Sequence, residues 1–253
     1  MRGEKQPPTV MGKFLRKYRN NFTIFEKNDF SLDNDFILEV KDLLLPSYVN
    51  PDSLIKRVIN QYNHIIYSKN ENGTLCSFFT VNFDFIDNEI ICNLGLLAVR
   101  NEYKGSDLVF PLGYRCIELL KQKEIEVGKR ILCWCTTATI QVYKIVQIFF
   151  DDCQPKCDGS IDSLGLQSLE KIVRGYKLNH DSSTPFVLKH HAVSTHYSFS
   201  EKQRIIRSVN NQNNSFFNSF NISEENGDRL IIIAFSPSDE KFNLISKRFK
   251  TSP

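Results

Sequence analysis

A lysine and a glycine stand where an apolar run meets a helix-like pattern, and such a junction can bind an anion. The apolar run Leu94–Val99 leads into a polar stretch with Lys104, Gly105 and Ser106, and an amphipathic segment begins near Asp107. A helix N-terminus offers unpaired N–H groups and the positive end of its dipole to a phosphate. Glycine lets the backbone approach such a ligand. The junction predicts a phosphate-binding turn, although the same residues could also be a plain connection.

A proline limits where this helix can begin. Pro111 is tolerated only in the first turn. We therefore expect the helix to begin at about Asp107 or Leu108, with Asp107 as its N-cap. The N–H groups most available to an anion would be those of Gly105, Ser106, Leu108 and Val109.

The elements that must position this turn follow from hydrophobic periodicity. The pattern predicts strands at 21–27, 64–69, 74–85, 89–100 and 129–135, and helices at 31–49, 51–63, 108–124 and 136–150. Three consecutive strands followed by alternation indicate an α/β (α+β) protein. Its central sheet would be mixed and mostly antiparallel, flanked by helices.

The flanking regions are less regular. Residues 1–20 carry several Lys and Arg residues and are predicted to be a flexible basic tail. Residues 151–253 should complete the sheet and shape the acceptor side of a site. A helix is expected at 163–178, and partial alternation indicates a strand over 184–199. Residues 185–191 and 229–235 are the expected closing strands, antiparallel, with a helix near 200–210 between them.

The order of elements in residues 21–150, together with the stretch LAVRNEYKGSDLV, resembles the GNAT superfamily of acyl-CoA N-acyltransferases. That family binds the coenzyme A pyrophosphate at a turn of the form Arg/Gln-x-x-Gly-x-Gly/Ala. Matching positions of the longer family stretch are Leu97, Val99, Tyr103, Lys104 and Gly105. The resemblance implies a GNAT-like core at 21–150 and transfer of an acyl group, acetyl first among them, from an acyl-CoA co-substrate to an amine acceptor.

The resemblance also implies roles for individual residues. Leu97 or a neighbour would supply an N–H to the developing oxyanion, and Tyr143 would protonate the leaving thiolate. Tyr143 could equally be a packed core aromatic. Glu89 is the first candidate base, followed by Asp84 and Asp87, although all three could be solvated turn residues. The implied cofactor-binding residues are Leu97, Val99, Tyr103, Lys104, Gly105, Ser106, Asp107, Leu108, Val109 and Thr136.

Two departures from the family pattern keep a second hypothesis open. Asp107 and Val109 occupy positions where the family has glycine, and Thr136 stands where the family has asparagine. A carboxylate at 107 would repel phosphates if it capped its own helix. The alternative is therefore a catalytically inactive GNAT-like binding or interaction module.

Composition limits the remaining possibilities. The net charge of +3 is small, and no apolar run approaches the length of a membrane span. We expect a cytoplasmic protein with no nucleic-acid or membrane partner, and a homodimer stays open. The seven cysteines mostly lie in apolar runs, so we expect buried, reduced thiols. The spacing of Cys133, Cys135, Cys153 and Cys157 is unlike common zinc sites, so no metal is expected. Among His190, His191 and His196, one could line an acceptor cleft.

Overall fold

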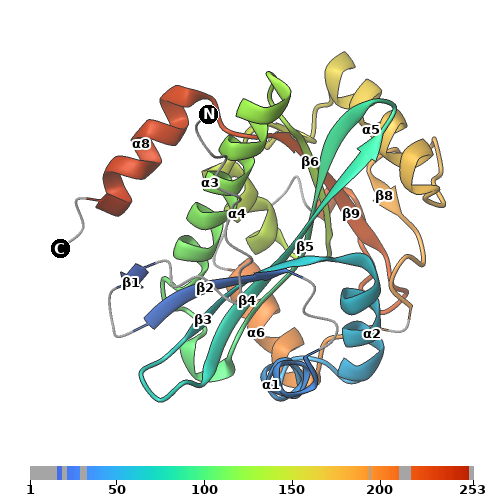
Figure 1. Ribbon diagram of the computed structural model, residues 1–253. Helices are drawn as coiled ribbons and strands as arrows, with labels where there is room; N and C mark the ends of the chain where they lie inside the picture. Colours follow the sequence, from blue (N-terminus) through green and yellow to red (C-terminus); the bar gives the residue numbers. More distant parts are fainter. Residues whose placement is uncertain (1–15, 19–21, 29–32, 194, 211–217, 251–253) are drawn as a thin grey trace, which may run out of the picture.

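The computed structural model describes residues 16–18, 22–28, 33–193, 195–210 and 218–250, which form one nine-stranded sheet with helices on both faces (Figure 1). The strands are β1 Arg16–Tyr18, β2 Phe22–Asn28, β3 His64–Lys69, β4 Leu75–Ile86, β5 Glu89–Val99, β6 Leu132–Thr137, β7 Asp151–Gln154, β8 Val187–Leu188 and β9 Arg229–Phe235. The helices are α1 Asn34–Leu44, α2 Pro51–Gln61, η2 Asn101–Tyr103 (3₁₀), α3 Val109–Val127, α4 Ile140–Phe149, α5 Ser163–Tyr176, α6 Phe199–Asn210 and α8 Asp239–Lys250. None of these helices combines the length and apolarity that a bilayer span requires.

The strand order confirms the predicted mixed, mostly antiparallel sheet. Strands β1 to β5 are consecutive antiparallel neighbours, and β5 pairs with β6 in parallel across the α3 crossover. Strand β9 then enters between β6 and β7, antiparallel to both, and β8 adds to β9. The two expected closing strands therefore do pair antiparallel in this sheet, and α6 lies between them in the chain.

Local turn chemistry explains the early hairpins. The β3–β4 turn has Gly73 at φ +79°, a conformation that glycine adopts without steric cost. Between β4 and β5, Asp87 and Asn88 both have positive φ, as a two-residue hairpin turn requires. Asn and Asp are the side-chain-bearing residues that best tolerate this region.

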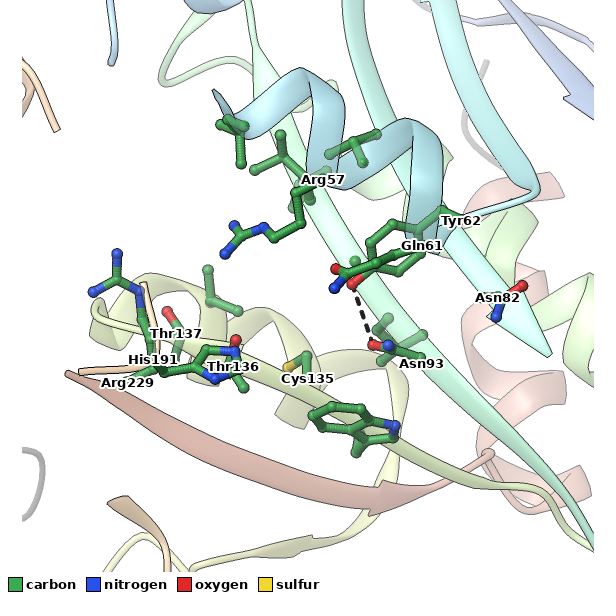
Figure 2. A pocket seen from close by; sticks show the side chains of 18 of the residues that line it. Arg57, Gln61, Tyr62, Asn82, Asn93, Cys135, Thr136, Thr137, His191 and Arg229 are labelled. Carbon is green, nitrogen blue, oxygen red and sulfur yellow. Dashed lines mark hydrogen bonds between the residues drawn. The ribbon is translucent and has the colours of Figure 1, made fainter. Parts of the chain in front are cut away.

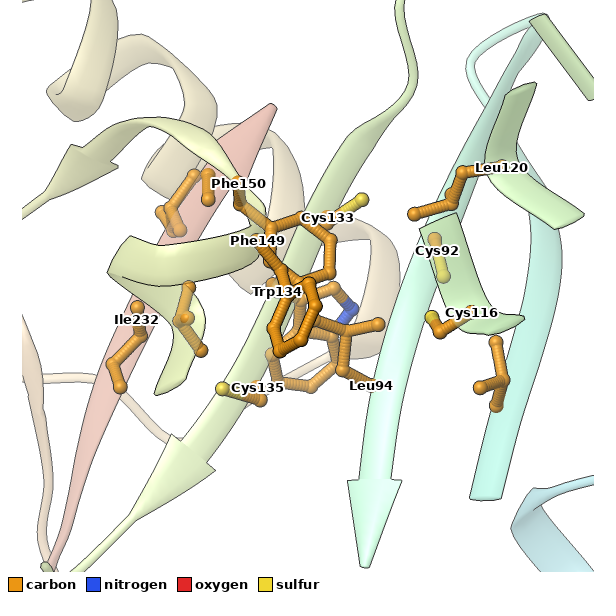
Figure 3. Packing of buried hydrophobic residues seen from close by; sticks show 14 of the residues in the cluster. Cys92, Leu94, Cys116, Leu120, Cys133, Trp134, Cys135, Phe149, Phe150 and Ile232 are labelled. Carbon is orange, nitrogen blue, oxygen red and sulfur yellow. The ribbon is translucent and has the colours of Figure 1, made fainter. Parts of the chain in front are cut away.

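Side chains alternate between two core layers. Ile66 of β3 faces the large cluster that includes α3 and α4, whereas its neighbours Ile65 and Tyr67 face α1 and α2. The strands that carry both layers are buried on both faces and read as continuous apolar runs. Figure 3 shows part of the large cluster, in which Cys92 and Cys116 lie beside Leu120 and near Cys133.

Strand β9 is the most deeply buried of the strands in the C-terminal part, residues 151–253. Its residues from Arg229 to Ala234 are all buried, because β6, β7 and β8 flank the strand and helices cover the sheet. The apolar run that predicted burial on both faces is confirmed.

Several elements differ from the sequence-based expectation. Residues 16–18 were expected in the tail but form β1, which pairs with β2. The other residues of the expected tail, 1–15 and 19–20, lie outside the described residues. The strand expected over 184–199 is reduced to the two residues of β8. Strand β7 and helix α8 were not expected at all. Each is short or follows a polar stretch, so periodicity alone carries little information there.

An ion pair joins strand β2 to helix α3. Arg115 of α3 donates two hydrogen bonds to Glu26 of β2, at 2.9 and 3.1 Å, and His64 lies 3.7 Å from the same carboxylate. Burial raises the pKa of Glu26, but His64 and Arg115 outweigh burial and lower it to about 2. The charged carboxylate therefore stabilises the fold.

We expect Glu26→Gln to remove part of the acid sensitivity of the protein. A folded-state pKa below the unfolded value contributes stability above pH 4.5, and this contribution is lost as the pH falls toward 2. The loss amounts to about 3 kcal/mol. Denaturant unfolding at pH 7 and pH 3 should show about 2 kcal/mol of this loss, because the folded-state carboxylate is still mostly ionised at pH 3, and the exposed Glu102→Gln serves as control. An equal pH dependence in both variants would contradict this account.

Candidate active site

Two neighbouring strands part in the middle of the sheet. Strands β5 and β6 pair through only three residue pairs, from Ile91 with Leu132 to Asn93 with Trp134. Beyond these pairs β5 stays on β4, and β6 stays on β9 as far as Thr137. Since a central strand directs alternate backbone groups to each neighbour, β5 beyond Asn93 has groups that face the gap without a strand partner.

A bulge turns β5 away from β6. Phe79 pairs with Leu97, whereas Val81 pairs with Leu94, so β5 holds one extra residue opposite Thr80. The Thr80 hydroxyl accepts a hydrogen bond from the backbone N–H of Leu96 at 2.9 Å. Bulges bend a strand and increase its local twist, which accounts for the parting.

Glycine is required at this bulge. A Cβ on Gly95 would lie 2.5 Å from Cζ of Tyr62 and closer still to the Thr80 hydroxyl. The Tyr62 ring therefore packs directly over the β5 backbone, and its hydroxyl lies 3.4 Å from Asn93 at the last paired residue. Burial raises the pKa of Tyr62 to about 12, so this phenol is protonated at neutral pH.

The parted strands enclose a cavity of about 470 Å³ (Figure 2). Both strands line it, with β5 residues 93–97 on one side and β6 residues 134–137 on the other. Helix α4 adds an apolar wall of Val142, Ile145 and Val146. Helix α2 and the residue after it add a polar wall that includes Arg57, Gln61 and Tyr62. The cavity is thus apolar toward α4 and polar toward α2.

Pairing registers identify the face of the sheet that the polar wall occupies. Asn93 pairs with Trp134, and Trp134 pairs with Ile233, so these side chains share one face. Trp134 packs on Tyr176 of α5, with ring centroids 4.5 Å apart. Two-residue periodicity places Arg229 on this same face. The polar end therefore lies on the α2 and α5 side, opposite α3 and α4.

A carboxylate on β4 forms part of the polar wall. Asp84 accepts hydrogen bonds from the Tyr176 hydroxyl and from Asn82, each at 2.6 Å. Burial and the nearby Asp84 raise the pKa of Tyr176, so the phenol stays protonated. Asp84, one of the lower-ranked base candidates from the sequence, is the one acidic residue of the described chain that lines the cavity.

Three basic side chains line the mouth of the polar end. Figure 2 shows Arg57 of α2 across the gap from Arg229 of β9 and His191. Burial and the charge of Arg229 lower the pKa of Arg57. Partial burial and both arginines lower the pKa of His191, although its exposure at the mouth lets water screen part of this effect. Of the three histidines discussed from the sequence, His191 is the one that lines the cavity.

Only two of the predicted cofactor-binding residues line this cavity, Leu97 and Thr136. Of the others, Val99 is the last residue of β5, and the residues from Tyr103 to Val109 follow the strand, with Gly105, Ser106 and Asp107 exposed. Their binding role stays a prediction.

The turn itself differs in detail from the expectation. Helix α3 begins at Val109, and the N-cap is Leu108 with no side-chain hydrogen bond, so Asp107 as a cap was wrong. The Ser106 N–H is used by Tyr103 at 3.1 Å. Among the described residues, no partner is found for the N–H groups of Gly105, Leu108 and Val109. Three of the four expected donors are thus available.

Lys104 is engaged elsewhere. Its ammonium donates to Glu201 of α6 at 2.6 Å and to Ser47 at 2.7 Å, and it is largely buried. The segment between β8 and β9, which carries α6, is therefore joined to the loop before α3 by this ion pair. Gly105 has φ +86° and open space where a Cβ would stand.

The two residues predicted as catalytic lie away from the cavity lining. Tyr143 is fully buried, donates to the Pro155 carbonyl at 2.8 Å and accepts from Gln147 at 3.1 Å. Glu89 pairs with Lys129 at 2.5 Å and with Lys171, and these lysines lower its pKa. Catalytic roles for both stay predictions from the resemblance.

Cysteine placement gives no support for a metal centre. Cys76, Cys92, Cys116, Cys133 and Cys135 are buried and free. Cys153 is partly buried, Cys157 is exposed, and both are free as well. Within the described ranges no group of three or more His, Cys, Asp or Glu side chains is placed to hold an ion. Burial raises the pKa of Cys135 to about 12, which makes it an inert thiol.

Sequence reasoning missed Tyr62, Arg57 and Arg229. Tyr62 immediately follows α2, Arg57 lies within an ordinary amphipathic helix, and Arg229 opens a buried strand. The one cue was Arg229 itself, a charged residue beside an apolar run that needs burial.

No protein-family model matches the chain, and no curated protein sequence matches it. Similar solved structures include the GNAT family N-acetyltransferase YhbS from Escherichia coli in complex with CoA, with 14% identity, 56% of this chain and 71% of that chain covered, and a TM-score of 0.38. An aminoglycoside acetyltransferase from an uncultured soil metagenomic sample has 16% identity over 50% of this chain and 84% of its own, with a TM-score of 0.34. The AtaT toxin bound to acetyl-CoA and the C-terminus of its antitoxin has 14% identity over 51% and 85%, with a TM-score of 0.37.

The fold is GNAT-like in the order of its own elements. Strands β2 to β5, helix α3, strand β6 and helix α4 follow one another as the resemblance implied, with α1 and α2 after the first of these strands. The described chain thus has the element order that the resemblance implied, together with a gap between β5 and β6.

We expect Gly95→Ala to disrupt the bulge. The new methyl group would collide with the Tyr62 ring and with Thr80, and either the ring or the β5 backbone must move. The cost should be about 1–3 kcal/mol, as for overpacking in a core. Chemical denaturation measures it. Gly128→Ala is the control, because its Cβ meets no atom within 4 Å and its cost comes only from a positive φ. A cost for Gly95→Ala well below about 1 kcal/mol would show that Gly95 is not under steric constraint.

Proposed function

We propose that the chain is an N-acyltransferase that moves an acyl group from an acyl-CoA to an amine. The gap between β5 and β6 is the observation that carries this proposal. A thioester placed there would lie against unpaired backbone groups of β5, which can stabilise a developing oxyanion. The apolar α4 wall suits the pantetheine and acyl portions, and the polar wall suits an amine.

We further propose that the pyrophosphate binds at residues 103–109. The unpartnered N–H groups of Gly105, Leu108 and Val109 lie at the positive end of α3. Asp107 is exposed and does not cap the helix, so its carboxylate need not occupy these donors. Lys104 contributes less than the resemblance implied, because Glu201 neutralises its charge.

Proton transfer can be assigned to groups in the cavity. The amine attacks the thioester carbon, the carbon–sulfur bond breaks, and one proton must leave the nitrogen while another reaches the sulfur. We assign the role of proton acceptor to Asp84, which would take the proton from the amine directly or through a water. Tyr62 is the donor to the thiolate, because its protonated hydroxyl lies where the strands part.

Binding is tested first. Coenzyme A and acetyl-CoA should raise the melting temperature of the protein by mass action. Gly105→Glu places a negative charge at the proposed phosphate site and should abolish the shift. Gly128→Glu is a matched control at the other end of α3, with the same positive φ and the same open surroundings. An undiminished shift in the Gly105 variant would place the cofactor elsewhere.

Chemistry is tested by thiol release against an amine panel. Tyr62→Phe and Asp84→Asn should each lower kcat by about 10²–10⁴-fold. Tyr143→Phe and Glu89→Gln are assayed alongside them, with unfolding curves for all four variants. A loss of kcat confined to the latter pair would support the assignment from sequence over ours. Coenzyme A binding without thiol release from any amine would favour the binding-module alternative.

A further inference from the structure

Three basic groups from separate parts of the chain meet at the polar end of the cavity. Arg57 comes from α2, His191 from the segment after β8, and Arg229 from the start of β9 (Figure 2). Arg57 is mostly buried and Arg229 is 8% exposed. The fold thus brings two guanidinium groups to one partly enclosed place.

Neither arginine has a carboxylate partner within the described residues. Arg229 donates to the carbonyl oxygens of Asp228 at 2.7 Å and Thr195 at 3.2 Å, which carry no net charge. Arg57 has no hydrogen bond or ion pair in the described chain. By contrast, five other arginines each pair with an Asp or Glu: Arg100, Arg115, Arg130, Arg174 and Arg204.

Unneutralised charge in a partly enclosed place is costly. Burying a guanidinium without a counter-charge loses solvation, and the two arginines also repel each other. Among the described residues, Asp84 is the one carboxylate that lines the cavity, and it is already hydrogen-bonded to Tyr176 and Asn82. An anionic ligand would relieve this cost, because guanidinium groups bind carboxylates and phosphates through paired hydrogen bonds.

The location of the arginines separates this anion from the phosphates of coenzyme A. Arg229 and Arg57 lie on the α2 and α5 face of the sheet. The proposed pyrophosphate site lies at the N-terminus of α3, and α3 covers the other face. The α2 end is therefore the acceptor end of the cavity.

We propose that Arg57 and Arg229, with His191, bind an anionic group of the acceptor, so that the substrates are amines that also carry a carboxylate or phosphate. This inference rests on the proposed acyl transfer for the identity of the ligand. The anion site itself stands on the uncompensated arginines. Polycationic amines would meet like charge at this end and should be poor acceptors.

Matched pairs of small amines test the inference on the full chain. Calorimetric titration in the presence of coenzyme A compares 4-aminobutyrate with butylamine and O-phosphoethanolamine with ethanolamine. In at least one pair, we expect the amine that carries a carboxylate or phosphate to bind about tenfold or more tightly than the partner that lacks this anionic group. The pair that shows the preference distinguishes a carboxylate site from a phosphate site.

Variants identify the groups responsible. Arg57→Gln should bring the preference close to one, whereas Arg57→Lys, which keeps the charge, should retain part of it. Lys56→Gln is the control, since it removes the same charge from an exposed neighbour on α2. Melting curves establish that each variant is folded. Absence of any preference in the parent protein, absence of binding by all four probes, or a preference unchanged in Arg57→Gln would overturn the inference.

Two further readouts separate this inference from the proposed function. If Arg57→Gln weakens coenzyme A about tenfold while the amine preference persists, the arginines serve the cofactor phosphates and the inference is wrong. If the anionic amines bind selectively but no thiol is released, the anion site is supported and the acyl transfer is not.

Discussion

The structure around the site depends on one pair of strands that stop sharing hydrogen bonds. Three residue pairs hold β5 to β6, and the extra residue opposite Thr80 then bends β5 away. In a closed sheet the unpaired backbone groups beyond Asn93 would be satisfied by the neighbouring strand. Here they face a cavity instead, and the cost of leaving them unpaired is offset by pairing elsewhere in the sheet. β4 and β9 hold the parted strands on their outer sides.

Packing keeps the gap open. The Tyr62 ring lies over Gly95 and prevents β5 from straightening, while the apolar wall of α4 prevents collapse from the other face. The Lys104–Glu201 pair fastens the loop that follows β5 to α6. The segment between β8 and β9 thereby contacts the turn that follows the C-terminal end of β5, where we propose that phosphate binds. It also carries Thr195, whose carbonyl orients Arg229.

Much of the architecture could be predicted because it is local. The turn at Gly73, the alternation of β3 and β4 and the apolar run of β9 each leave a pattern within a few residues. β1 and β8 are too short to show a period, and α8 follows a polar stretch. The predicted N-cap at Asp107 is wrong, because α3 begins at Val109 and its N-cap is therefore Leu108. The site was only partly predictable. Leu97 and Thr136 belong to the strands that part, but Arg57 is brought to His191 and Arg229 by tertiary contacts between segments more than a hundred residues apart.

The late place of β9 in the chain affects how the protein becomes functional. On a ribosome, the strands from β1 to β6 are synthesised first, and β6 then has an open edge where β9 will later pair. Until residues 229–235 emerge, that edge is exposed, and Arg229 is absent from the polar end of the cavity. The nascent protein therefore cannot present a finished binding cavity before its sheet is complete.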